Sequence, residues 1–182
     1  MVLKKMKKVS ILFLLCSCLF CACKKKNISL EGETIVMNLG YAEESITYQL
    51  HFTSSSEFTY TLRSLYDGSE YEHSYGTYSY NKDKLSLFLS GDNYEVVCET
   101  KTNKKSSLEG TKWKVTCNNN VSIIELQSTA YNYKGGKDNT RGVYNYDGMT
   151  LTFVDADDYY RYGYTYAYKV SCGSLLYDMA KK

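Results

Sequence analysis

The sequence contains no proline, and glycine and serine do not gather into a linker anywhere along its 182 residues. It therefore lacks the kind of spacer that separates independent domains. It also lacks an apolar run near the ~20 residues that a membrane-spanning helix needs. Its apolar stretch near the N-terminus, 9–20, has only 12 residues. One domain, or two small adjoining ones, remain as the alternatives for the body of the protein.

The apolar stretch fits the central region of a secretory signal. Lys4, Lys5, Lys7 and Lys8 precede it, and no acidic residue occurs before position 31. A short core helix is the alternative, but three further lysines at 24–26 follow the stretch closely and argue against burial. We therefore predict that residues 1–22 form a signal peptide.

The end of this segment, Leu-Phe-Cys-Ala-Cys at 19–23, resembles the lipobox of bacterial lipoproteins. Ala22 stands at the small residue of that motif and Cys23 at the cysteine that receives diacylglycerol, whereas Phe20 stands where leucine is usual. The rival segment 15–18, Leu-Cys-Ser-Cys, has a better-placed leucine but would shorten the apolar region. The resemblance implies cleavage before Cys23 and a lipid on its thiol.

A lipidated chain of this kind would be held on a membrane of the bacterial cell envelope, which is the outer membrane if the cell has one. A single acyl chain binds a bilayer reversibly, so the two or three chains of a lipoprotein make the anchor stable. Residues 23–29 would form the tether. Loss of the signal changes the net charge from +2 to −2, because four lysines leave with it. The mature body therefore has no basic footprint for nucleic acid.

The body favours β-structure, because it carries most of the 20 tyrosines together with many threonines, valines and serines. An internal repeat organises it. Residues 76–87 align without gaps with 142–153, and Leu-Glu-Gly occurs at both 30–32 and 108–110. Asp-Gly at 147–148 is a hairpin signal, because such turns need positive φ. We predict two related halves, 30–107 and 108–182.

Alternation of apolar and polar residues predicts twelve strands and no helix. A meander of this many strands hides its edges most simply by closing, so we predict an all-β, antiparallel, barrel-like fold. The predicted strands cover 33–38, 45–53, 57–65, 71–80, 84–90, 93–101, 111–117, 121–128, 130–135, 141–146, 149–154 and 159–170.

The order of motifs in the second half resembles the lipocalin-like domains of bacterial lipoproteins. Leu-Glu-Gly-Thr-Lys-Trp at 108–113 is followed by a hairpin over 123–133 and by Gly-Val-Tyr leading to Leu-Thr-Phe over 142–153. Two residues separate the glycine from the tryptophan where the family has one, and Ile35 replaces the tryptophan in the first half. The resemblance implies a barrel-like fold of about eight to ten strands and no single ligand.

The most unusual local feature is a run of alternating tyrosines, Tyr160, Tyr162, Tyr164, Tyr166 and Tyr168. Alternate residues of a strand share a face, so these five rings would line one side of it. That side is interpreted either as core or as a binding surface. Tyrosine suits a binding surface because it combines a large rigid area with a polar group. We predict binding of a glycan, an apolar small molecule or an envelope protein.

A second group of aromatic residues alternates in the first half. Tyr71, His73 and Tyr75 form one set, and Tyr78 and Tyr80 form another. They are interpreted either as part of the same binding surface or as ordinary strand residues.

Three cysteines lie in the body: Cys98, Cys117 and Cys172. Each ends a similar phrase in which an apolar residue and an aromatic share its face, which predicts buried thiols. A bridge between Cys98 and Cys117 across a hairpin is the alternative. The spacings match no zinc motif.

The sequence offers no catalytic or phosphate-binding motif. Asp155, Asp157 and Asp158 form an acidic turn that lacks the spacing of a calcium loop, so a solvated turn is the preferred interpretation. We predict no metal and no cofactor. The function expected is a binding or interaction module of the envelope rather than an enzyme, with an envelope hydrolase and a structural spacer as the alternatives.

Overall fold

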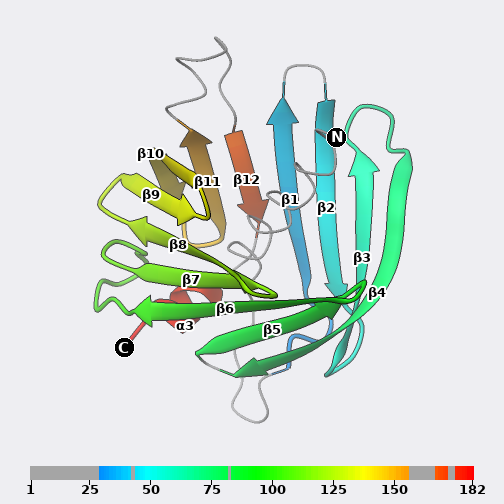
Figure 1. Ribbon diagram of the computed structural model, residues 1–182, viewed down its shortest axis with the longest axis horizontal. Helices are drawn as coiled ribbons and strands as arrows, with labels where there is room; N and C mark the ends of the chain where they lie inside the picture. The colour runs from blue at the N-terminus through cyan, green and yellow to red at the C-terminus, as the bar shows by residue number, and fades with distance from the viewer. Residues whose placement is uncertain (1–28, 42–43, 82, 156–166, 172–174) are drawn as a thin grey trace.

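The computed structural model describes residues 29–41, 44–81, 83–155, 167–171 and 175–182. Within these ranges the chain forms twelve β-strands and one short helix (Figure 1). The prediction of an all-β fold built as an antiparallel meander is confirmed. In this part of the chain no helix is long and apolar enough to cross a bilayer.

The strands lie close to the predicted ranges. They are β1 (Thr34–Tyr41), β2 (Glu44–Phe52), β3 (Glu57–Ser64), β4 (Glu70–Asn81), β5 (Lys84–Leu89), β6 (Asp92–Thr100), β7 (Lys112–Cys117), β8 (Asn120–Leu126), β9 (Ala130–Gly135), β10 (Asp138–Tyr146), β11 (Thr150–Asp155) and β12 (Ala167–Ser171). The last strand differs most from its predicted range of 159–170, because β12 begins at Ala167 and the residues just before it lie outside the described ranges.

Every strand pairs antiparallel with the next one along the chain, and β1 pairs with β12 as well as with β2. In the β1–β12 ladder Val36 lies opposite Ser171. Short turns join several of the neighbouring strands, including β10 and β11. In the β10–β11 turn Gly148 has a φ of 96°, as the Asp-Gly signal predicts, and the Asp147 carboxylate accepts hydrogen bonds from the backbone N–H groups of Met149 and Thr150. These hydrogen bonds lower the pKa of Asp147.

One face of most strands packs into a single core, because buried and exposed residues alternate along them, as in β5 and β9. In β5, for example, Leu85, Leu87 and Leu89 are buried, whereas Phe88 between them is 46% exposed. The other large core side chains come from most of the remaining strands: Ile35, Met37, Tyr48, Leu50, Phe52, Phe58, Tyr60, Leu62, Tyr78, Tyr94, Val96, Trp113, Val115, Ile124, Leu126, Tyr131, Tyr133, Tyr144, Leu151 and Phe153. We call the opposite side of the sheet its outer face.

A short helix, α3 (Leu175–Ala180), was not predicted, because six residues are too few to show a helical period. It contributes Leu176, Met179 and Ala180 to the core, each no more than 1% exposed. The Thr102 N–H donates a hydrogen bond to the carbonyl oxygen of Ala180 over 2.6 Å, and Thr102 and Lys181 form a parallel bridge. The helix is thereby fixed next to the segment that follows β6.

The two Leu-Glu-Gly segments make the same backbone contact. The Gly32 N–H donates to the carbonyl oxygen of Phe52 over 2.8 Å, and the Gly110 N–H donates to that of Leu126 over 2.7 Å. Both glycines have a positive φ, 84° and 79°, and residues other than glycine rarely adopt such backbone angles.

Two further glycines allow aromatic rings to lie against the backbone. Gly76 is paired with Phe58, and Gly142 is paired with Tyr131. A Cβ on Gly76 would lie 2.3 Å from Cζ of Phe58. A Cβ on Gly142 would lie 2.0 Å from the carbonyl oxygen of Val154 and 2.8 Å from Cε1 of Tyr131. Only glycine fits at these two positions, which the sequence repeat aligns.

The tyrosines two residues beyond these glycines have equivalent hydrogen bonds. The Tyr78 hydroxyl donates to the carbonyl oxygen of Ser54 over 2.9 Å and accepts from the Leu30 N–H over 3.0 Å. The Tyr144 hydroxyl donates to the carbonyl oxygen of Gln127 over 2.5 Å. Burial raises the pKa of Tyr144 to about 12. In both cases a largely buried ring ends in a hydroxyl that holds a neighbouring turn.

Candidate functional site

Most of the residues proposed from the sequence for anchoring and binding lie outside the described ranges. These are the lipid acceptor Cys23 and four tyrosines of the stripe, Tyr160, Tyr162, Tyr164 and Tyr166. The fifth tyrosine, Tyr168, lies in β12, where it pairs with Leu39 of β1 and Phe153 of β11. Asp155 ends β11, and Asp157 and Asp158 again lie outside the described ranges.

The proposed bridge between Cys98 and Cys117 is wrong. Both residues lie on the facing strands β6 and β7, but Cys98 is opposite Trp113 and Cys117 is opposite Tyr94. The two thiols are therefore offset along the ladder and are not bonded to each other. Burial of Cys98, which is 5% exposed, agrees with the prediction of a buried thiol, whereas Cys117 is only half-buried. Cys172 lies outside the described ranges.

The aromatic residues of β4 divide between the two faces of the sheet. Tyr75 points to the outer face and is 75% exposed, and Tyr71, at the bulge of β4, is 62% exposed. The His73 ring lies 5.2 Å from that of Tyr75, and its Nδ1 lies 3.6 Å from the Glu70 carboxylate. Tyr78, in contrast, is 6% exposed and belongs to the core, so it does not contribute to an exposed binding surface.

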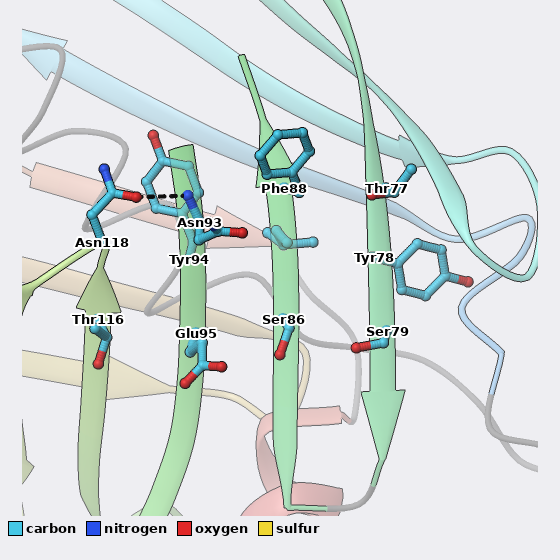
Figure 2. Close-up of a pocket in the computed structure, with 11 residues that line it drawn as sticks. Thr77, Tyr78, Ser79, Ser86, Phe88, Asn93, Tyr94, Glu95, Thr116 and Asn118 are labelled. Atoms are coloured by element: carbon cyan, nitrogen blue, oxygen red, sulfur yellow. Dashed lines mark hydrogen bonds between the residues drawn. The ribbon is translucent and has the colours of Figure 1, made fainter. Parts of the chain in front are cut away.

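A hollow of about 490 Å³ opens on the outer face of β4–β7 (Figure 2). The backbone of Tyr78, Leu87 and Tyr94 forms its floor, because the side chains of these three residues point to the core side of the sheet. Polar side chains and one ring surround it: Thr77, Ser79, Ser86, Phe88, Asn93, Glu95, Thr116 and Asn118. We call this feature the polar hollow.

Strand register brings these side chains together, although they come from four different strands. Ser79 lies opposite Ser86, which lies opposite Glu95, which lies opposite Thr116. Figure 2 shows the four in one row across the sheet. Serine and threonine are small, so this row leaves space above the backbone that longer side chains would fill.

A second row begins at Thr77, which lies opposite Phe88, and Phe88 lies opposite Asn93. Tyr75 precedes Thr77 by two residues on the same face, which makes it a diagonal neighbour of Phe88 at about 7–8 Å. Tyr75 and Phe88 therefore form an exposed aromatic strip at the edge of the polar hollow. Tyr71, which is also exposed, lies further along β4 at the bulge where the pairing shifts from Leu62–Glu72 to Arg63–Glu70.

The rim of the hollow is held in place by Asn118, which has a positive φ of 53°. Its side-chain oxygen accepts from the Asn93 N–H over 2.9 Å, and its side-chain nitrogen donates to the Asp92 carboxylate over 2.7 Å. Glu95 is the ionisable side chain among the lining residues, and it forms an ion pair with Lys84. Hydrogen bonds therefore hold the rim of the hollow, and the Asp92 carboxylate leaves a negative charge there.

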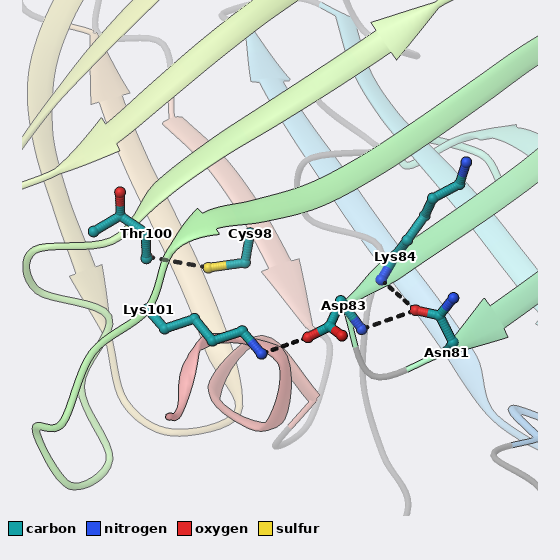
Figure 3. A network of polar contacts seen from close by, with 6 residues as sticks. All are labelled: Asn81, Asp83, Lys84, Cys98, Thr100 and Lys101. Atoms are coloured by element: carbon teal, nitrogen blue, oxygen red, sulfur yellow. Dashed lines mark hydrogen bonds and ion pairs between the residues drawn. The ribbon is translucent and has the colours of Figure 1, made fainter.

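A separate polar network surrounds the buried thiol of Cys98 (Figure 3). The thiol donates to the carbonyl oxygen of Thr100 over 3.2 Å, and Lys101 pairs with Asp83 at 2.5 Å. Burial raises the pKa of Cys98 to about 12. Since the thiolate is the reactive form, this cysteine is not poised as a nucleophile. The network stabilises the end of β6 next to α3.

Metal-ligating side chains do not gather in the described residues, where no group of three His, Cys, Asp or Glu side chains could hold an ion. The chain matches no protein-family model, no curated protein and no solved structure. The sequence did not predict the polar hollow. Phe88 was the available signal, because it is an aromatic residue at an outward position between two core leucines.

Proposed function

We propose that this chain is a lipoprotein of the bacterial cell envelope, made with a signal peptide over 1–22 and anchored through a lipid on Cys23. Its basic start, its 12-residue apolar stretch and the small residue before Cys23 support the proposal. The lysines at 24–26 would lie beside anionic headgroups, where each contributes about 1 kcal/mol of attraction.

The anchor is tested by changing the two candidate acceptors separately. Cys23→Ser should release the protein from membranes or stall its processing, whereas the matched variant Cys18→Ser should remain anchored. Mass spectrometry of the mature N-terminus should show acyl groups on Cys23. Acylation of Cys18, or an unmodified start at any other residue, would contradict the assignment.

We propose further that the body is a barrel-like, lipocalin-like fold composed of two related halves, 30–107 and 108–182. The pairing of β1 with β12 supports closure. The matched backbone contacts of Gly32 and Gly110, and the matched ring contacts of Gly76 and Gly142, support the relation between the halves. If each half needs the other to cover its apolar face, residues 108–182 alone should not unfold cooperatively.

The body would act as a binding module for an envelope ligand or partner. The observation that carries this proposal is the exposed aromatic strip, because the large rings of Tyr75 and Phe88 remain in solvent on one face of a well-packed sheet. Exposed aromatic patches on a folded domain are typical of interaction sites. The tyrosine stripe at 160–168 remains a second proposed binding surface.

The stripe is tested with Tyr164→Ala. If its face is a binding surface, unfolding free energy should change by no more than about 0.5 kcal/mol and ligand or partner binding should weaken. If its face is core, the same change should cost about 3–5 kcal/mol. A large stability loss with binding intact would remove the stripe from the proposed site.

A further inference from the structure

The polar hollow and the aromatic strip together define the chemistry of a ligand. The hollow presents hydroxyl groups from Ser79, Ser86 and Thr116, and amide groups from Asn93 and Asn118. Hydroxyls and amides both donate and accept hydrogen bonds. A matching ligand would therefore carry many groups that also do both.

The charge of the site limits the chemical class of ligand that can bind there. Glu95 is paired with Lys84, and the Asp92 carboxylate held by Asn118 adds a negative charge at the rim, so the hollow offers no positive charge to an anion. Nucleic acids and phosphorylated ligands need a basic surface. The site therefore disfavours anionic ligands and fits a ligand that carries no negative charge.

The strands themselves argue against a peptide as the ligand. A peptide that binds to a sheet usually adds a strand at a free edge. Each of β4, β5, β6 and β7 already pairs with a strand on both sides. The remaining contacts on this face come from side chains only.

We propose that this face binds a neutral saccharide chain. A pyranose ring has hydroxyl groups around its edge, which match the hydroxyls and amides of the hollow, and C–H groups on its face, which stack on aromatic rings. Phe88 is the ring at the hollow, and Tyr75 extends the platform along β4. The saccharide would lie across the outer face, with one sugar in the hollow and the next unit on Tyr75.

This inference deepens the proposed binding function by naming its ligand class and its site. The test uses the full chain and neutral hexasaccharides of glucose, mannose, xylose and N-acetylglucosamine, with a polyuronate as the charged comparison. Isothermal titration calorimetry should show saturable binding of at least one neutral saccharide and weaker or no binding of the polyuronate. Tighter binding of the polyuronate, or no binding of any neutral saccharide, would overturn the proposal.

Variants then locate the site. Phe88→Ala should raise Kd about tenfold, as expected for a central aromatic contact. Ser86→Tyr should abolish binding, because its ring would occupy the hollow while pointing away from the core. The matched control is Val143→Ala, an exposed apolar residue on β10. Unchanged melting temperatures for all three variants would show that the fold is intact.

The outcomes separate this inference from the broader proposal. If Phe88→Ala and Ser86→Tyr bind the saccharide as well as the control does, the assigned site is wrong even though the chain binds ligands. If no neutral saccharide binds but an envelope protein is captured and the capture needs Tyr164, the binding function stands and the saccharide inference falls.

Discussion

Gly142→Ala provides a direct test of the packing that the two halves share. The added Cβ would lie 2.0 Å from the carbonyl oxygen of Val154 on β11, where ordinary contact begins near 3.4 Å. The strands would have to separate by more than an ångström, and the ring of Tyr131 would also have to move. Overpacking of this kind costs about 1–3 kcal/mol.

A smaller effect opposes this cost. Alanine restricts the unfolded chain more than glycine does and so stabilises the folded state by about 0.4–1 kcal/mol where its backbone fits. Because the clash is with backbone, we expect a net loss of about 2 kcal/mol, or about 4–8 °C in melting temperature. Urea unfolding can be followed by the fluorescence of Trp113, the sole tryptophan, which is 2% exposed in the fold.

The control and a second-site variant make this test decisive. Val143→Ala changes the adjacent residue on the outer face and should alter stability by no more than about 0.5 kcal/mol. Tyr131→Leu should not rescue Gly142→Ala, because the closest contact is with the backbone oxygen. Phe58→Leu should partly rescue Gly76→Ala, whose closest contact is the Phe58 ring. A Gly142→Ala protein as stable as the control would refute the reasoning.

Three further predictions concern the core and its hydrogen bonds. Met179→Ala in α3 should cost about 2–5 kcal/mol in urea unfolding, whereas Met149→Ala, 66% exposed in a turn, should cost almost nothing; equal effects would mean that α3 does not cover the core. The stability of the wild-type protein should fall between about pH 9 and 12, because the unfolded thiol ionises near its ordinary pKa of 9.0 while burial holds the pKa of folded Cys98 at about 12. Cys98→Ala should reduce this fall, and urea midpoints that decrease with pH as steeply in the variant as in the wild type would contradict the prediction. Tyr144→Phe should cost about 1 kcal/mol by removing the hydrogen bond to Gln127, and an unchanged urea midpoint would show that this bond is not stabilising.

The strands could be predicted from the sequence because each carries its own alternating pattern. In β5 the leucines at 85, 87 and 89 mark the core face without any knowledge of the neighbouring strands. The helix α3 could not be predicted in this way. Leu176, Met179 and Ala180 are buried because they pack against a completed sheet, whose strands lie elsewhere in the sequence.

The polar hollow could not be predicted either, because it depends on register between strands. Ser79, Ser86, Glu95 and Thr116 are ordinary polar residues at solvent positions of four separate strands. Their alignment depends on the length of each turn and on the irregularity between Cys98 and Thr100 that shifts β6 against β7. A single sequence contains these offsets, but no local pattern reports them.

The pairing of β1 with β12 has a consequence for the order of events during folding. β1 finds one neighbour in β2, immediately after it in the chain, but its other neighbour, β12, is made only after the strands from β2 to β11. Closing a contact over so much intervening chain is slow, since the whole loop must be ordered before the contact is made. Residues of α3, made later still, then cover part of the core. A chain that is still being made therefore cannot complete this sheet and core until β12 and α3 have emerged.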